Sequence, residues 1–128
     1  MRILVCGGRS FADKEFVFRT LSILYRDEWC KNLPNPIREE DLTIISGCAK
    51  GPDTFALQWA VWAGFTQDKY PAEWEKYGKS AGPIRNQQMI DEGKPDLVIA
   101  FPGGAGTADM IRRAKKAGIE VKEIKYLE

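Results

Sequence analysis

Short apolar runs alternate along the chain with longer segments in which apolar residues recur every three or four positions. The runs predict strands, because a parallel strand that is covered on both faces is apolar throughout. The predicted strands are the apolar runs 2–6, 42–46 and 96–101, together with the more polar segments 65–70 and 119–124. The helical spacing predicts helices at residues 13–28, 52–63, 83–92 and 108–117. Two stretches without periodicity, 30–41 and 71–82, are expected to form loops.

The alternation of strands and helices predicts an α/β fold, because parallel strands need a crossover between them and a helix usually supplies it. We expect a single Rossmann-like domain of three layers, since 128 residues suffice for one core. Its five-stranded sheet should be mostly parallel, with the strand order 3-2-1-4-5. Ligands of such sheets bind beyond the carboxyl ends of the strands, where the order reverses. Glycine-containing loops follow the first, second and fourth strands, so three loops are expected to line one crevice.

The PGGAGT loop after the fourth strand is the strongest candidate for a phosphate-binding site. Glycines let the backbone approach a ligand closely, and the amides at the N-terminus of a helix favour an anion. The threonine can cap the helix or donate its hydroxyl to that anion. A tight turn without a ligand is the alternative interpretation. The candidate ligand contacts in this loop are Pro102, Gly103, Gly104, Gly106 and Thr107.

The loop after the first strand supplies a cation and a hydroxyl. The guanidinium of Arg9 can close on a phosphate or a carboxylate, with the Ser10 hydroxyl beside it, although a solvated surface arginine is the plainer interpretation. The candidate contacts in this loop are Gly7, Gly8, Arg9 and Ser10.

The loop after the second strand, SGCAKGPD, is a second junction between a strand and a helix at the same crevice. Its aspartate is either a helix cap or a contact to a ribose. Its cysteine has no histidine partner and is not expected to act as a nucleophile. The candidate ligand contacts are Ser46, Gly47, Lys50, Gly51 and Asp53.

Further candidates lie in the segment that precedes and opens the third predicted helix. Arg85 can reach a phosphate or stabilise developing charge, and Asn86 can read a base or hold a loop; a surface pair at a helix start is the alternative. Trp74 can stack on a base or anchor the loop by packing. Trp59 and Trp62, inside a predicted helix, are expected in the core or in a homodimer contact.

Composition removes several classes of function. The formal charge is +1 and no basic block occurs, so a nucleic-acid partner is not expected. The absence of histidine and of CxxC spacing argues against a metal site and a histidine-based dyad. Neither GxGxxG nor GxxxxGK[ST] occurs, and no cofactor is expected. No apolar run is long enough to span a membrane and no signal peptide is evident, which predicts a cytoplasmic protein without a membrane partner.

Four stretches, GGRSF, ISGCAKGPD, YPAEWEKYGKSAGPIRNQ and DLVIAFPGGAGTADM, together resemble the YspA-like (cpYpsA-related) branch of the SLOG superfamily. The resemblance covers nearly the whole chain and implies a Rossmann-like fold, commonly homodimeric, that binds nucleotides or nucleotide-derived molecules. The PGGAGT loop is also similar to the PGGxGTxxE loop of the Lonely Guy phosphoribohydrolases. In those enzymes the glutamate of the loop acts with an arginine on a glycosidic bond. In this chain Met110 stands at the glutamate position, Asp109 precedes it, and Arg85 matches the arginine.

Two functions follow as hypotheses. The first is a binding module that senses, carries or sequesters a nucleotide or a nucleotide-derived small molecule. The alternative is a phosphoribohydrolase or N-glycosidase that uses Asp109 and Arg85 as catalytic residues. Contact with single-stranded DNA, as in the distant DprA-like relatives, is disfavoured because no basic face is evident. A scaffold with an empty crevice is the remaining interpretation.

Overall fold

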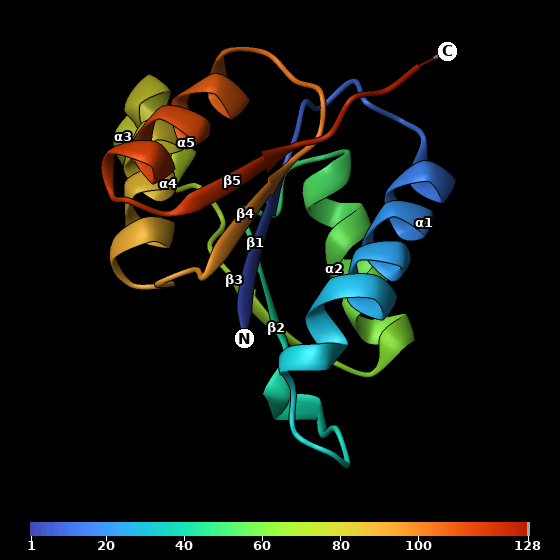
Figure 1. The fold of residues 1–128 in the computed structure, drawn as a ribbon. Coiled ribbons are helices and arrows are strands. Elements are labelled where there is room, and N and C mark those ends of the chain that lie inside the picture. Colours follow the sequence, from blue (N-terminus) through green and yellow to red (C-terminus); the bar gives the residue numbers. More distant parts are fainter. Residues whose placement is uncertain (128) are drawn as a thin grey trace.

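The computed structural model describes residues 1–127 and forms three layers, with helices on both faces of one sheet (Figure 1). The sheet has the order β3-β2-β1-β4-β5, and all four neighbouring pairs are parallel. The predicted α/β fold and strand order are therefore confirmed. The strands are β1 (Arg2–Cys6), β2 (Thr43–Ser46), β3 (Thr66–Lys69), β4 (Leu97–Ala100) and β5 (Glu120–Glu123).

The helices divide between the two faces of the sheet, as Figure 1 shows. One face is covered by α1 (Lys14–Leu24) and α2 (Pro52–Ala63). The other is covered by α3 (Trp74–Tyr77), α4 (Ala81–Asp91) and α5 (Ala105–Lys116). Within residues 1–127 no helix is both long and apolar enough to cross a membrane.

The central strand β1 divides the core because alternate side chains of a strand point to opposite faces. Ile3 and Val5 pack on the side of α1 and α2, whereas Leu4 packs on the side of α4 and α5. Trp59 is buried in the first of these clusters, and its indole Nε1 donates to Ser22 Oγ at 3.0 Å. Trp59 is thus a core residue, whereas Trp62 on the same helix is 70% exposed.

Two helices, α4 and α5, begin earlier than the sequence predicted. The first turns of both helices lie at the predicted crevice. Helix α5 begins at Ala105 instead of residue 108, because Gly104 serves as its N-cap and its carbonyl accepts from the Ala108 amide at 3.0 Å. The last glycine of PGGAGT therefore lies in the first helical turn. Helix α4 begins two residues before Pro83, which a first turn tolerates because the missing N–H would have no partner there.

The two predicted loops contain short helical pieces. The segment 71–82 holds α3 and a 3₁₀ turn, Gly78–Ser80. The segment 30–41 holds two 3₁₀ turns, Cys30–Asn32 and Glu39–Asp41. The predicted helix 13–28 continues after α1 as a π-helical stretch over Tyr25–Trp29. Such short pieces lack the repeated apolar spacing that reveals a helix of several turns.

Candidate functional site

A cavity of about 800 Å³ lies at the carboxyl ends of the strands, the place at which the sequence predicted a crevice. Segments far apart in the sequence meet there: the β1–α1 loop, the start of α2, helices α3 and α4, and the first turn of α5. The predicted contacts that line it are Gly7, Gly8, Arg9, Ser10, Asp53, Trp74, Arg85, Asn86, Gly104, Gly106, Thr107 and Asp109. The fold thus brings most of the predicted site residues together.

The other predicted contacts lie outside the lining of the cavity. The buried hydroxyl of Ser46 donates to the Asp53 carbonyl at 2.9 Å and accepts from the Cys48 amide at 3.1 Å. Lys50 is exposed to solvent. The remaining residues of this group belong to backbone turns: Gly47, Gly51, Pro102 and Gly103.

Glycines allow two loops to touch backbone to backbone. The Gly8 amide donates to the Pro102 carbonyl at 2.9 Å, and a Cβ at Gly8 would lie 2.8 Å from Gly103 Cα. Gly51 has φ +85°, a conformation that side chains rarely adopt, and a Cβ there would lie 2.6 Å from the Gly8 carbonyl. These glycines are required by loop packing, whether or not they also contact a ligand.

The N-terminal turn of α5 borders the cavity. The first amides of a helix have no intrahelical acceptor, and the helix dipole adds positive potential there. No side chain caps Gly104, and the space around the position of its missing Cβ is open to beyond 4 Å. Thr107, by contrast, is buried against Gly103. Gly104 and Gly106, unlike Gly103, therefore leave open space beside the backbone where it borders the cavity.

Arg9 and Trp74 form a cationic and aromatic wall. The Arg9 guanidinium carbon lies 5.4 Å from the centre of the Trp74 ring, at cation–π distance. Trp74 is 47% exposed, so a large part of this aromatic side chain is not used in packing. A planar base can stack on such a surface, with the guanidinium close to the phosphate that the base carries.

The floor of the cavity holds a buried carboxyl group and a partly buried guanidinium. Asp53 is only 5% exposed and accepts from the Ala49 amide at 3.4 Å. Burial raises the pKa of Asp53 to about 6, and the charge of Arg85 and the nearby backbone amides offset part of this effect. Burial lowers the pKa of Arg85, which Asp53 partly opposes. A carboxyl group with a perturbed pKa in a cavity is typical of a functional site.

Asp53 makes the stability of the protein dependent on pH. The pKa of its carboxyl rises from an ordinary 3.8 to about 6 in the folded state, so the folded protein binds the proton more tightly than the unfolded chain. Its contribution to stability is therefore present below about pH 4 and is lost as the pH rises to about 6. We expect the unfolding free energy of wild type to fall by about 3 kcal/mol relative to Asp53→Asn between about pH 4 and 7. Urea denaturation at each pH measures this difference, and parallel profiles for the two proteins would contradict it.

The cavity also contains a thiol that the sequence did not single out. Cys6, at the end of β1, lies in the lining, and burial raises the pKa of its thiol. Burial likewise raises the pKa of Cys48. Both thiols stay protonated at neutral pH and are poor nucleophiles. Within residues 1–127 no three Cys, Asp or Glu side chains are arranged to hold a metal ion.

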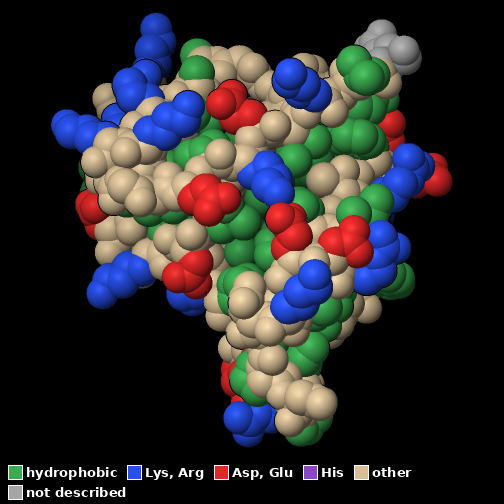
Figure 2. All heavy atoms as spheres, viewed as in Figure 1, with side chains coloured by type: hydrophobic (Ala, Val, Ile, Leu, Met, Phe, Trp, Pro, Cys, Tyr) green, Lys and Arg blue, Asp and Glu red, His purple; other side chains and the backbone are tan. Residues whose placement is uncertain are grey.

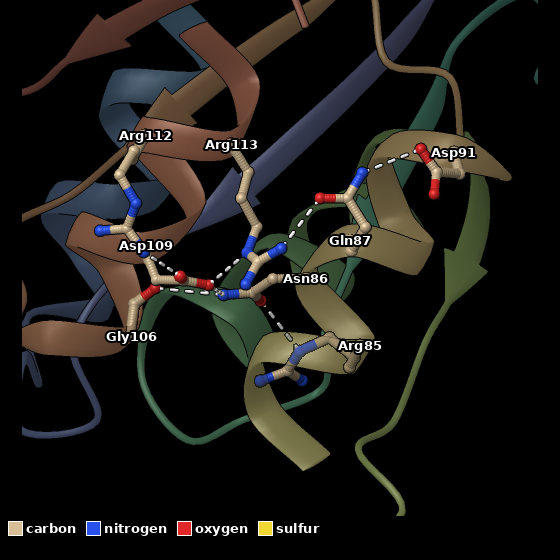
Figure 3. Close-up of polar contacts among 8 residues, drawn as sticks. All are labelled: Arg85, Asn86, Gln87, Asp91, Gly106, Asp109, Arg112 and Arg113. Atoms are coloured by element: carbon tan, nitrogen blue, oxygen red, sulfur yellow. Dashed lines mark hydrogen bonds and ion pairs between the residues drawn. The ribbon is translucent and has the colours of Figure 1, made fainter. Parts of the chain in front are cut away.

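Asp109 is held by three donors from two helices (Figure 3). Arg112 contacts Oδ1, while Oδ2 accepts from Arg113 Nε at 2.8 Å and from Asn86 Nδ2 at 3.0 Å. Burial raises the pKa of Asp109, but the bonds from Arg113 and Asn86 and the two arginine charges lower it more, so the net shift is downward. This carboxylate is ionised, and each of its oxygens already accepts from at least one donor.

Arg112 and Arg113 were not predicted as site residues, although their spacing from Asp109 carries a signal. Residues three and four positions apart share one face of a helix, where opposite charges pair. Met110, which replaces the glutamate of the Lonely Guy loop, is almost fully buried and packs in the core on the α4 and α5 side. No carboxylate therefore stands at that position.

Two comparisons relate the chain to known proteins. The sequence profile of the YspA, cpYpsA-related SLOG family matches residues 1–77, which include the loops after β1 and β2. The chain is also similar to the Gene 61 protein of Mycobacterium phage D29. The two are 36% identical over 129 aligned residues, which cover 94% of this chain and 93% of the phage protein.

Proposed function

The chain belongs to the YspA, cpYpsA-related SLOG family, and we propose that its cavity binds a nucleotide or a nucleotide-derived small molecule without cleaving it. One observation carries the proposal: the cavity joins the uncapped first turn of α5 to an exposed aromatic wall. A phosphate suits the first of these features and a base suits the second.

The polar groups of the cavity fit the parts of such a ligand. The ligand phosphate lies at the Gly104 backbone, close to the guanidinium of Arg9 or Arg85. The base stacks on Trp74. The buried carboxyl of Asp53 accepts from a hydroxyl or an amino group of the ligand, as carboxylates do for ribose in dinucleotide-binding folds.

Hydrolysis of a glycosidic bond is less well supported. Such a reaction needs a carboxylate placed against the developing positive charge of the sugar. Asp109 lines the cavity, but Arg112, Arg113 and Asn86 occupy its oxygens and offset its charge. The buried Met110 offers no substitute.

Contact with single-stranded DNA also finds little support. Such proteins carry a positively charged groove that follows the phosphate backbone. On the face in Figure 2, acidic and basic side chains are interspersed, with no continuous basic stripe. The formal charge of +1 agrees with this distribution.

The proposal includes a cytoplasmic location and a homodimer. Two large apolar side chains on α2, Val61 and Trp62, are 67% and 70% exposed. Their exposure on one helix favours association with a second copy, because adjacent exposed apolar side chains are common at protein contacts. This contact would lie on α2, away from the wall formed by Arg9 and Trp74.

A panel of AMP, GMP, CMP and UMP tests the proposed function. We expect at least one of them to raise the melting temperature by several degrees, since a ligand at about 100 times its Kd stabilises a protein by about 2.7 kcal/mol. We expect no release of free base in the same samples, measured by liquid chromatography. Base release that Asp109→Asn abolishes would establish the hydrolase instead, and the absence of stabilisation by every member would contradict the proposal.

A further inference from the structure

A chain of polar contacts leads from the cavity through the seam between α4 and α5 to the outer surface (Figure 3). Arg85 Nε donates to Asn86 Oδ1 at 3.1 Å, and Asn86 Nδ2 donates to Asp109 Oδ2 at 3.0 Å. Arg113 Nε donates to the same carboxylate oxygen at 2.8 Å, and its Nη1 donates to Gln87 Oε1 at 2.9 Å. These five residues thus form a continuous path from Arg85, which lines the cavity, to Arg113 and Gln87, which do not.

The contacts of Asn86 fix the orientation of its amide. Its oxygen accepts from Arg85, while its nitrogen donates to Asp109 and to the Gly106 carbonyl at 3.2 Å. Rotating the amide by half a turn would place two donors face to face at Arg85 and two acceptors face to face at Asp109. Asn86 is only 6% exposed, so water could relieve little of the cost of such mismatches. The Asp109 carboxylate and the Gly106 carbonyl therefore together decide which atom Asn86 presents to Arg85.

This arrangement leaves one nitrogen of the Arg85 guanidinium, Nη2, available to a ligand. Nε is used by Asn86, and Nη1 donates to the Gly47 carbonyl. Nη2 has no acceptor among residues 1–127, and Arg85 lines the cavity. With two of its three nitrogens held, the guanidinium can offer Nη2 to an anion without first losing side-chain freedom.

Arg113 itself cannot touch a ligand in the cavity. It is absent from the cavity lining and instead borders an open groove of about 700 Å³ on the outer side of α4. Gln87 holds it there and in turn donates to Asp91 Oδ1 at 2.9 Å. We propose that Arg113 is a positioning residue, which acts through Asp109 and Asn86 to hold Arg85 ready for the ligand's phosphate. This inference rests on the proposed function for its ligand, but the geometry it describes exists without one.

The first test needs no ligand. In a ¹⁵N NMR spectrum, the Arg85 Nε–H signal reports on its bond to Asn86. We expect Arg113→Met to move this signal and to speed its exchange with water, and Arg113→Lys, which keeps a donor near Asp109, to restore it in part. The control Lys116→Met removes the same charge from an exposed position of α5 and should leave the signal unchanged. An unchanged signal in Arg113→Met would overturn the inference.

The second test uses the nucleoside monophosphate that stabilises most in the panel, together with its parent nucleoside. We expect Arg113→Met to weaken the monophosphate about tenfold and the nucleoside little, because only the phosphate meets Arg85. In an Arg85→Met background, the further loss on Arg113→Met should disappear. An equal loss for both ligands, or an undiminished loss without Arg85, would mean that Arg113 acts only on the fold.

The outcomes separate this inference from the proposed function. If no member of the panel binds, the proposed function fails, while the NMR test still decides whether Arg113 positions Arg85. If a monophosphate binds and needs Arg85 but is indifferent to Arg113, the proposed function stands and the positioning role fails. Should Arg113→Met not fold, Arg113→Gln replaces it, because its shorter, uncharged side chain lacks the guanidinium that bonds Asp109 and Gln87 at once. An unchanged Arg85 signal and unchanged affinity in Arg113→Gln would overturn the inference.

Discussion

Replacing Gly103 by alanine is expected to destabilise the fold by about 3 kcal/mol, although it adds a single methyl group. The new Cβ would overlap Thr107 Oγ1 and would lie 2.5 Å from the Gly8 amide nitrogen and 2.9 Å from Thr107 Cβ. Neither neighbour can retreat easily. The Gly8 amide is bonded to the Pro102 carbonyl, and Thr107 is buried in the first turn of α5. Urea denaturation followed by circular dichroism measures the loss.

Gly106→Ala is the matched control for this prediction. It adds the same methyl group three residues later, in the first turn of α5, but no atom lies within 4 Å of the new Cβ. Alanine also favours a helix over glycine by up to about 1 kcal/mol, so Gly106→Ala should be neutral or slightly stabilising. If both variants lost stability equally, the close contact between the two loops would not be the cause.

Replacing Gly104 by valine is expected to abolish ligand binding while the protein stays folded. The position of its Cβ is free of neighbours to beyond 4 Å and borders the cavity, so the side chain would fill the space above the first turn of α5. A phosphate could then no longer reach the helix amides, and we expect its affinity to fall by at least about a hundredfold, as the loss of two charge-assisted hydrogen bonds implies. Isothermal titration with the best monophosphate of the panel measures this loss.

The interpretation of Gly104→Val depends on its unliganded state. A melting temperature close to that of wild type, together with lost binding, would locate the phosphate at this turn. Unchanged affinity in a folded Gly104→Val protein would place the phosphate elsewhere in the cavity and would contradict the proposed mode of binding. Gly103→Ala and Gly104→Val therefore separate the two roles of adjacent glycines, one in packing and one in ligand access.

The sheet could be predicted from the sequence because strands are marked by local patterns and because general rules of chain connection limit their order. Apolar runs such as 96–101 mark buried strands, and the right-handed crossover leaves few arrangements for five parallel strands. The start of α5 could not be predicted in the same way. Its first turn contains Gly106, and glycine is a poor helix former, so the pattern placed the helix three residues too late.

At the site, the sequence could indicate which residues matter but not what they contact. A glycine after a strand shows that something comes close to the backbone, but not whether it is a ligand or another loop; for Gly8 it is the backbone of Gly103. Asp109 was a candidate catalytic residue because it stands beside the missing glutamate. The helical spacing alone could have revealed two of its donors, Arg112 and Arg113. The third, Asn86, is distant in the sequence and is brought to it only by the packing of α4 against α5.

The bond between the Gly8 amide and the Pro102 carbonyl has a consequence for the speed of recognition. Two loops that already touch do not have to rearrange around an arriving molecule. The association rate constant of a ligand is therefore not lowered by a slow conformational change of these loops. Association with such a preformed receptor is governed by diffusion and orientation. Differences in affinity among related molecules would then arise in how long each one stays.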